Sequence, residues 1–322
     1  MSEPHPSTVV LLGAQRYHPT LRTHVAALGL KGRIAIVTAG WQERESEDAE
    51  LVAELGGRVV NLHLHARGEQ VFKADRELAD AHRERQDALR HMQTLYRLWL
   101  ERALDAEQVV GHANVPTPLR DEARVGAIDA VRHLDRWHLE QCSRVRAEYD
   151  AKLHPFDRTS VQKHRVEIAK LLDECEVLVI AGGHVAVLVN RLLMFGIPEL
   201  IGTRAVLAWS GGAMAVTDRV VLFHDTPPQG RGACEVLDRG IGLVPGVVVF
   251  PEPEQRLELD SAERVSLSAR RFAPARCLVM PGGTSATYRS GMFVEAEGAR
   301  VLDADGRHMA LDDTHFGDGA GA

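Results

Sequence analysis

The chain has 322 residues, a formal net charge of -7 at pH 7 and an apolar fraction of 45%. This length and apolar content can fill a proper core, which indicates a globular enzyme or binding protein. The negative charge excludes a general nucleic-acid binder, because no pervasive basic excess is available to neutralise phosphates.

The N-terminal residues and the cysteines indicate the compartment. No basic segment followed by an apolar run stands at the start, and no apolar stretch is long enough to span a bilayer. The cysteines are far apart with no Cys-x-x-Cys pair, which fits neither a disulfide framework nor a zinc site; they are Cys142, Cys175, Cys234 and Cys277. We expect a cytoplasmic protein with reduced core cysteines, no membrane contact, no metal and no cofactor.

In the first third of the chain, short apolar runs alternate with amphipathic segments. The runs Thr8–Leu12, Arg33–Thr38 and Arg58–His65 are predicted to be strands. Their alternation with helical segments predicts parallel βαβ units. His63 and His65 would lie on one face of the third strand, which we expect to meet solvent.

From about Gln70 to Asp173 the pattern changes to long, charged helical periodicity. One apolar stripe follows the period of an α-helix and contains Leu89, Met92, Tyr96, Trp99 and Ala103. A break at Gly111 and Pro116 precedes a second helical segment from about Asp121 to Tyr149. We expect an insertion of two facing helices, over 70–173, within a single α/β domain that spans 1–322. Its expected function is either a lid or an arm that forms a homodimer.

The first inserted helix also carries a series of arginines, namely Arg83, Arg85, Arg90, Arg97 and Arg102. These cations could steer an acidic peptide toward a site. Glutamate and aspartate residues are interleaved with them, however, which is typical of an ordinary helix surface laced with salt bridges.

Alternation of strands and helices resumes near Glu176. The further apolar runs that we predict to be strands are 176–181, 204–209, 219–224, 242–250 and 276–280, and a terminal hairpin over 287–294 and 299–302. A helix is predicted over Val185–Phe195. The whole pattern predicts an α/β fold with a mainly parallel sheet flanked by helices.

Ser210 stands where a strand-like run meets a glycine-rich helix start, in Ala208-Trp-Ser-Gly-Gly. A serine nucleophile at a sharp strand-to-helix turn needs small residues two before and two after it, and this sequence meets that demand. The same pattern would also fit a serine that only caps a helix.

A second glycine turn strengthens the catalytic interpretation. An oxyanion hole needs two N–H donors, and Gly211 directly follows the serine while Gly183 ends a neighbouring predicted strand. Gly182-Gly183 lacks the spacing of a nucleotide-binding loop, so the other interpretation is an ordinary tight turn.

Three blocks resemble the dipeptidase E and cyanophycinase family of serine peptidases in order and spacing. They are Val177-Leu-Val-Ile-Ala-Gly-Gly-His, Ala208-Trp-Ser-Gly-Gly-Ala-Met and His224-Asp-Thr-Pro. The resemblance covers most of 170–305 and leaves out the helical insertion. It implies a fold like that of class I glutamine amidotransferases, Ser210 as nucleophile, Asp225 as the acidic residue of the triad, and a small peptide or amide substrate, with acidic substrates favoured in the family.

One departure from the family concerns the general base. The position that matches the family's catalytic histidine holds Glu252, in Val249-Phe-Pro-Glu-Pro. An unperturbed carboxylate is a far weaker base than a neutral imidazole near pH 7. Three outcomes are open: a Ser210, Glu252 and Asp225 arrangement active in acid, a histidine from elsewhere such as His184 or His224, or a protein that binds without turnover.

The leading expectation is therefore a serine-type peptidase or amidohydrolase. Ser210 would attack, Gly211 and Gly183 would stabilise the oxyanion, and Asp225 with Glu252 would handle the proton. A catalytically degenerate binding or regulatory protein on the same fold is the alternative. A glutamine amidotransferase is disfavoured, since that chemistry would need cysteine at position 210.

Overall fold

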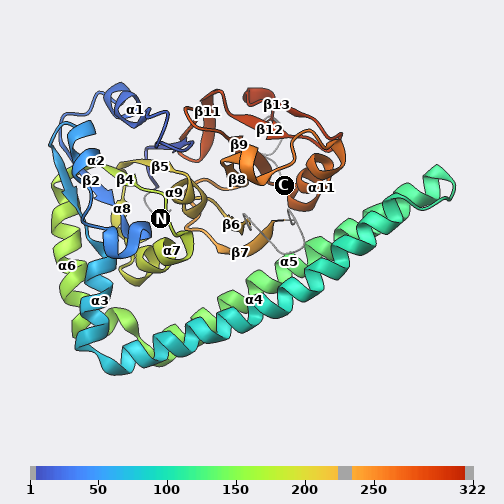
Figure 1. Ribbon diagram of the computed structural model, residues 1–322. Helices are drawn as coiled ribbons and strands as arrows, with labels where there is room; N and C mark the ends of the chain where they lie inside the picture. Colours follow the sequence, from blue (N-terminus) through green and yellow to red (C-terminus); the bar gives the residue numbers. More distant parts are fainter. Residues whose placement is uncertain (1–4, 224–233, 316–322) are drawn as a thin grey trace.

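A computed structural model describes residues 5–223 and 234–315 of the chain (Figure 1). The strands are β1 (Thr8–Leu12), β2 (Arg33–Val37), β3 (Val59–Asn61), β4 (Cys175–Ile180), β5 (Ala205–Trp209), β6 (Arg219–Leu222), β7 (Glu235–Arg239), β8 (Val247–Pro251), β9 (Arg276–Met280), β10 (Ser285–Arg289), β11 (Met292–Glu297), β12 (Arg300–Leu302) and β13 (His308–Ala310). The helices are α1 (Leu21–Ala27), α2 (Ala49–Glu54), α3 (Leu64–Ala74), α4 (Arg76–Gly111), α5 (Thr117–Leu153), α6 (Thr159–Asp173), α7 (Val185–Met194), α8 (Ile197–Ile201), α9 (Gly211–Ala215), α10 (Pro253–Arg256) and α11 (Ala262–Phe272), with short 3₁₀ helices η1 (Ala39–Arg44), η2 (Pro155–Asp157) and η3 (Asp313–His315).

The largest sheet has seven strands in the order β11-β10-β1-β5-β4-β2-β3. Strands β1, β5, β4, β2 and β3 run parallel, and β10 and β11 add an antiparallel hairpin at one edge. Parallel strands covered by helices on both faces appear in sequence as continuous apolar runs, as β1, β2, β4 and β5 do. The expected α/β fold with a mainly parallel sheet is confirmed.

Alternate residues of these strands enter two separate cores, since successive side chains of a strand point to opposite faces. In β1, Val9 and Leu11 belong to the core that includes side chains of α3, α6 and α7. Val10 and Leu12 belong to the core that includes side chains of α1 and α2. The carboxyl ends of β2, β4 and β5 therefore meet at one edge of a sheet that is buried on both faces.

A second sheet has the order β13-β12-β9-β8, in which β8 and β9 are parallel. Strands β6 and β7 form a separate antiparallel ribbon. The turn between the terminal strands differs from our prediction, because it falls inside the predicted run 287–294. Ser290 and Gly291 both have positive φ angles there, of 49° and 78°, which reverses the chain between β10 and β11.

Helices α4 and α5 pack along each other as a long hairpin, here called the arm (residues 76–153). The arm passes the β6–β7 ribbon and projects well beyond the body (Figure 1). Asp75 accepts a hydrogen bond from the amide of Leu78 at the start of α4, and Arg158 donates to both of its carboxylate oxygens at 2.6 and 2.8 Å. This cap and ion pair anchor the base of the arm. The division of the chain into one domain with an insertion over 70–173 stays a prediction.

The predicted strand Arg58–His65 is wrong in its second half. Strand β3 ends at Asn61, whose side-chain oxygen accepts a hydrogen bond from the amide of His63 at 2.9 Å, and α3 begins at Leu64. The buried carboxylate of Glu45 accepts from the amides of His65 and Ala66 at 2.9 and 2.8 Å. This distant residue satisfies the first donors of the helix, so His63 and His65 do not share a strand face.

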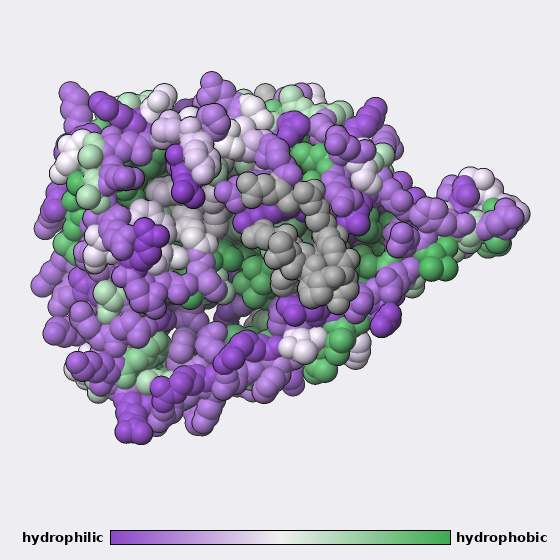
Figure 2. Space-filling model, viewed as in Figure 1, coloured by the Kyte–Doolittle hydropathy of each residue, from purple (hydrophilic) through white to green (hydrophobic). Residues whose placement is uncertain are grey.

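The predicted apolar stripe of the arm is also correct only in part. Tyr96 is fully buried, but 57% of Trp99 is exposed, and its ring lies 5.1 Å from that of Trp137. Figure 2 shows hydrophobic groups on the surface of the projecting arm. The four cysteines are buried and free, as expected. In the described residues, no helix combines the length and apolar character needed to cross a membrane.

Candidate active site

Ser210 stands between β5 and α9 in a strained backbone conformation, with φ of 48° and ψ of −118°. A non-glycine residue at positive φ costs about 1–3 kcal/mol and persists only where its surroundings hold it. The Ser210 amide donates to the carbonyl of Leu12 at 3.2 Å, and the Ser210 carbonyl accepts from the amide of Met214 at 3.1 Å. The strand, sharp turn and helix that a nucleophile elbow requires are all present around this serine.

The Gly182-Gly183 turn lies directly against the serine. A Cβ atom on Gly182 would lie 2.9 Å from Cβ of Ser210, a distance that side chains do not tolerate. Gly183 has a φ of 117°, and a Cβ on it would lie 2.5 Å from the carbonyl oxygen of Gly40. Both positions therefore require glycine, and the two turns pack backbone to backbone.

The amides of Gly183 and Gly211 are the expected oxyanion donors. The Gly183 nitrogen lies 3.4 Å from the place that a Cβ on Gly211 would take, so the two turns bring these residues together. In the part of the chain that the structure describes, neither amide donates a hydrogen bond to another protein group. Two unpaired N–H donors beside a strained serine are the kind of groups that oxyanion stabilisation needs.

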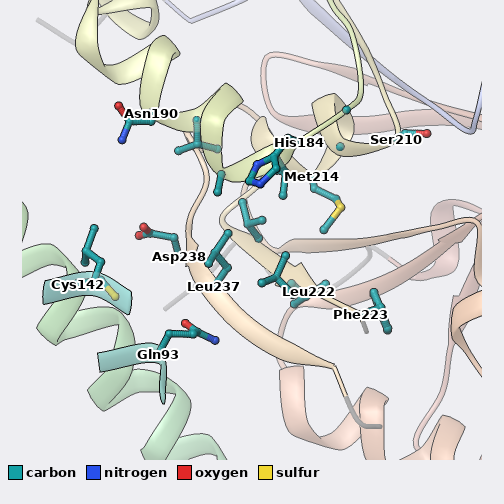
Figure 3. Close-up of a pocket in the computed structure, with 18 of the residues that line it drawn as sticks. Gln93, Cys142, His184, Asn190, Ser210, Met214, Leu222, Phe223, Leu237 and Asp238 are labelled. Carbon is teal, nitrogen blue, oxygen red and sulfur yellow. The ribbon is translucent and has the colours of Figure 1, made fainter. Parts of the chain in front are cut away.

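His184, one of the two alternative bases, starts α7 in the turn after β4. Its amide donates to the carbonyl of Gly40 at 2.8 Å, and its ring Nδ1 accepts from the amide of Val187 at 3.3 Å. The ring therefore caps the helix. Figure 3 shows the hydroxyl of Ser210 pointing away from this ring, although both residues line the same cavity.

Glu252 follows β8 in a left-handed conformation, with φ and ψ both of 51°. Glu252 lines the cavity that Ser210 also lines. Its carboxylate forms an ion pair with Arg256 at 3.2 Å and its side chain is 40% exposed. No hydrogen bond joins Glu252 to Ser210 among the described residues. Asp225 and His224 lie outside the described residues.

The cavity at Ser210 has a volume of about 790 Å³. Its lining includes Gly183, His184, Ser210, Gly211 and Glu252. Figure 3 shows His184 and Ser210 on the side away from Gln93 and Cys142 of the arm. A volume of this size lies within the range of small-molecule sites in proteins, about 300–1,000 Å³. Five of the seven candidate residues therefore share one cavity, while their catalytic roles stay predictions.

Residues that were not among the candidate site residues also line the cavity. The arm contributes Gln86, Leu89, Arg90, Gln93, Cys142 and Arg146, and the β6–β7 ribbon contributes Leu222, Leu237 and Asp238. No motif marks these positions, because each is separated from Ser210 by 12 to 124 positions along the chain. Helical amphipathicity and the series of arginines that includes Arg90 were the signals for the arm, and neither says what a helix packs against.

Cys142 is the only cysteine that lines the cavity among the described residues. Burial raises the pKa of its thiol to about 12, with the charge of Asp238 acting in the same direction. A thiol with this pKa stays protonated at neutral pH and is a poor nucleophile. Ser210 is therefore the better nucleophile candidate. The described residues contain no cluster of three His, Cys, Asp or Glu side chains suited to a metal ion.

No protein-family model and no curated protein matches the chain. Among solved structures, the chain is similar to a peptidase from an acI-B1 Actinobacterium, with 12% sequence identity and a TM-score of 0.45. The match covers 96% of this chain and 99% of the peptidase. A similarity at this level carries no conclusion about the chemistry of the chain. The resemblance to the dipeptidase E and cyanophycinase family therefore stays an interpretation of sequence motifs.

Proposed function

We propose that this protein is a serine-type peptidase or amidohydrolase that cleaves a peptide or amide bond with Ser210. The observation that carries the proposal is the strained serine between β5 and α9, beside two unpaired amides in a cavity of about 790 Å³. Strained residues cluster at active sites because their cost in stability must be offset by the surrounding structure, so the strain supports the proposal together with the amides and the cavity.

In the proposed reaction, Ser210 Oγ attacks the carbonyl carbon of the bound amide, and its proton passes to a carboxylate. The amides of Gly211 and Gly183 donate hydrogen bonds to the oxyanion of the tetrahedral intermediate. The carboxylic acid then returns the proton to the leaving amine as the C–N bond breaks, and water hydrolyses the remaining ester.

Glu252 is our candidate for the carboxylate, with Asp225 as the second acidic group that the sequence resemblance implies. A carboxylate is a weaker base than imidazole, and a pair that shares one proton works best in acid. We therefore propose an acidic pH optimum. Activity centred at neutral pH would point instead to a histidine base.

The alternative function is binding without turnover. It is favoured by the ion pair between Glu252 and Arg256, together with a Ser210 hydroxyl that bonds to no base among the described residues. A binding protein needs the cavity and no general base.

Labelling with a fluorophosphonate probe distinguishes the two functions. The parent protein and Ser210→Ala would be treated at about pH 4.5, where the proposed carboxylate mechanism works best, and at about pH 7.5, where an imidazole base would act. Labelling of the parent that Ser210→Ala loses supports the hydrolase. Absence of labelling at both pH values supports the binding protein. Cys142→Ala is the matched control and should label like the parent.

A further inference from the structure

Apolar side chains form one part of the lining of the cavity at Ser210, here called the apolar wall. Between the Ser210 end and the arm, half-buried apolar side chains line it, and they include Leu89, Leu222, Phe223 and Leu237. Met214 and Val189, which are almost fully buried, also line the cavity. Figure 3 shows Met214, Leu222 and Leu237 between Ser210 and the arm. A ligand that reaches from the serine toward the arm therefore contacts hydrocarbon along this stretch, before it meets polar side chains of the arm such as Gln86 and Gln93.

A β-bulge places Leu237 in this wall. Val220 pairs with Asp238 and Val221 pairs with Val236, so Leu237 is an extra residue without a partner on β6. A bulge redirects side chains locally, and here the consecutive residues Leu237 and Asp238 both reach the cavity. In a regular strand, successive side chains would point to opposite faces.

The arm fixes this part of β7 through side chains that bind three consecutive residues. Tyr96 Oη accepts from the amide of Val236 at 3.1 Å, His138 Nε2 lies 3.1 Å from the carbonyl oxygen of Leu237, and Arg146 Nη1 donates to Asp238 at 2.6 Å. The ring of Tyr96 also stacks on that of His138, with centroids 4.2 Å apart. The apolar wall is thus held in place before any ligand binds, which lowers the entropic cost of binding.

The charged groups of the cavity are already paired. Arg146 binds Asp238, Arg256 binds Glu252, and Arg90 binds Asp87. The first pair is well shielded from solvent, with side-chain exposures of 21% and 10%. Each pair already uses part of the hydrogen-bonding capacity of its arginine and its carboxylate, so an acidic or basic ligand group would compete with an existing partner. An apolar group meets no such competition.

We propose that this cavity binds a bulky apolar group of the substrate, an aromatic or branched aliphatic side chain next to the amide that Ser210 attacks. Leu89, Leu222 and Leu237 are the specificity-determining residues, and the arm contributes one side of the pocket. This proposal depends on the proposed function in one respect. The assignment of Ser210 as the nucleophile sets where the amide of the substrate lies in the cavity.

The test measures binding without turnover, by isothermal titration calorimetry on Ser210→Ala. The probes are N-acetylated amino-acid amides with phenylalanine, leucine, alanine and aspartate side chains. We expect the phenylalanine and leucine amides to bind at least about tenfold more tightly than the other two, as burial of several methylene-sized groups predicts. Equal affinities, or a preference for the aspartate amide, would overturn the proposal.

Substitutions within the Ser210→Ala background locate the pocket. We expect most of the preference for apolar amides to be lost in Leu237→Asp and also in the milder Leu222→Ala. If Leu237→Asp does not fold, Leu222→Ala still tests the pocket. The control Val166→Asp, at an exposed position on α6, should keep the preference for apolar amides. A preference unchanged in Leu222→Ala and in folded Leu237→Asp would place the binding group elsewhere.

Failure of this inference and failure of the hydrolase proposal give different results. Fluorophosphonate labelling of Ser210 with no apolar preference rejects only the pocket assignment. A clear apolar preference with no labelling rejects only the hydrolase and leaves a binding site for apolar amides.

Discussion

Arg271 of α11 and Asp135 of α5 form a bidentate ion pair in the interior, with both contacts at 2.7 Å and side-chain exposures of only 2% and 3%. The Tyr96 hydroxyl donates to Asp135 at 2.6 Å and accepts from Arg271 at 2.9 Å. Arg271 also donates to the carbonyl of Cys234, which precedes β7. Arg271 therefore links the arm, helix α11 and the β6–β7 ribbon beside the cavity.

The first prediction concerns this pair. Asp135→Ala leaves a buried guanidinium without its carboxylate, which typically costs about 3–5 kcal/mol of unfolding free energy. The double variant Asp135→Leu with Arg271→Met removes both charges and should recover most of that loss. Urea denaturation of the three proteins measures the effect. A double variant as unstable as Asp135→Ala would contradict the electrostatic explanation.

The second prediction concerns the glycine turn against the nucleophile. Gly182→Ala would place a methyl group 2.9 Å from Cβ of Ser210 and must displace one of the two turns. A displacement of about 1 Å at a reacting group can reduce turnover by about 10²-fold. We expect a loss of this order in the rate of fluorophosphonate labelling. Gly126→Ala is the control, since nothing lies within 4 Å of its Cβ on α5; it should label normally and gain up to about 1 kcal/mol of stability.

The third prediction concerns the base. Glu252→His puts an imidazole at the end of β8, in a left-handed conformation that histidine adopts more readily than most residues. If Glu252 occupies the position of the general base, Glu252→His should hydrolyse substrate at neutral pH about tenfold faster than the parent or more. Glu252→Gln should lower activity at every pH. A Glu252→Gln protein with full acid activity would remove Glu252 from the mechanism.

The fourth prediction concerns pH and the base of the arm. Burial, with the nearby charges of Arg85 and Arg191, lowers the pKa of His82 to about 3. Between about pH 6.5 and about pH 3 the unfolded chain binds a proton at His82 that the folded chain does not, so stability falls as pH falls. This proton on His82 changes the free energy of unfolding by at most about 1.4 kcal/mol per pH unit.

Denaturation in urea at about pH 7 and about pH 5 tests this linkage, because the two values lie on either side of the unfolded pKa. His82→Gln should lose less stability on acidification than the parent, whereas His133→Gln, at an exposed position on the arm, should not differ from it. Equal losses in the parent and His82→Gln would show that His82 is not the group responsible.

The fifth prediction concerns the arm as a dimer contact, which the sequence suggested. Leu95, Leu98 and Trp99 are each more than half exposed on α4, at spacings that place them on one side of the helix. We expect a solution mass of twice 35.4 kDa by light scattering, and a shift to the monomer in Leu95→Glu with Leu98→Glu. Val166→Glu is the matched control on α6. A parent protein that stays monomeric at high concentration would exclude the dimer.

Local rules account for what the sequence determined. The strands β1, β5 and β9 coincide with their predicted runs almost residue for residue, because burial on both faces leaves a continuous apolar signal. The turn at Ser210 could also be predicted from the sequence, since small residues must flank a backbone with this φ and ψ. The arm helices were predicted from their periodicity alone.

Tertiary contacts decided the rest. The carboxylate of Glu45 starts α3 where alternating residues predicted a strand, and the turn at Ser290 divides a run that looked continuous. The apolar wall of the cavity depends on the arm side chains that hold β7 and on the bulge at Leu237. Such contacts join residues far apart in the chain, and no local pattern encodes them. The serine elbow could therefore be found from the sequence, whereas the cavity that would select its substrate could not.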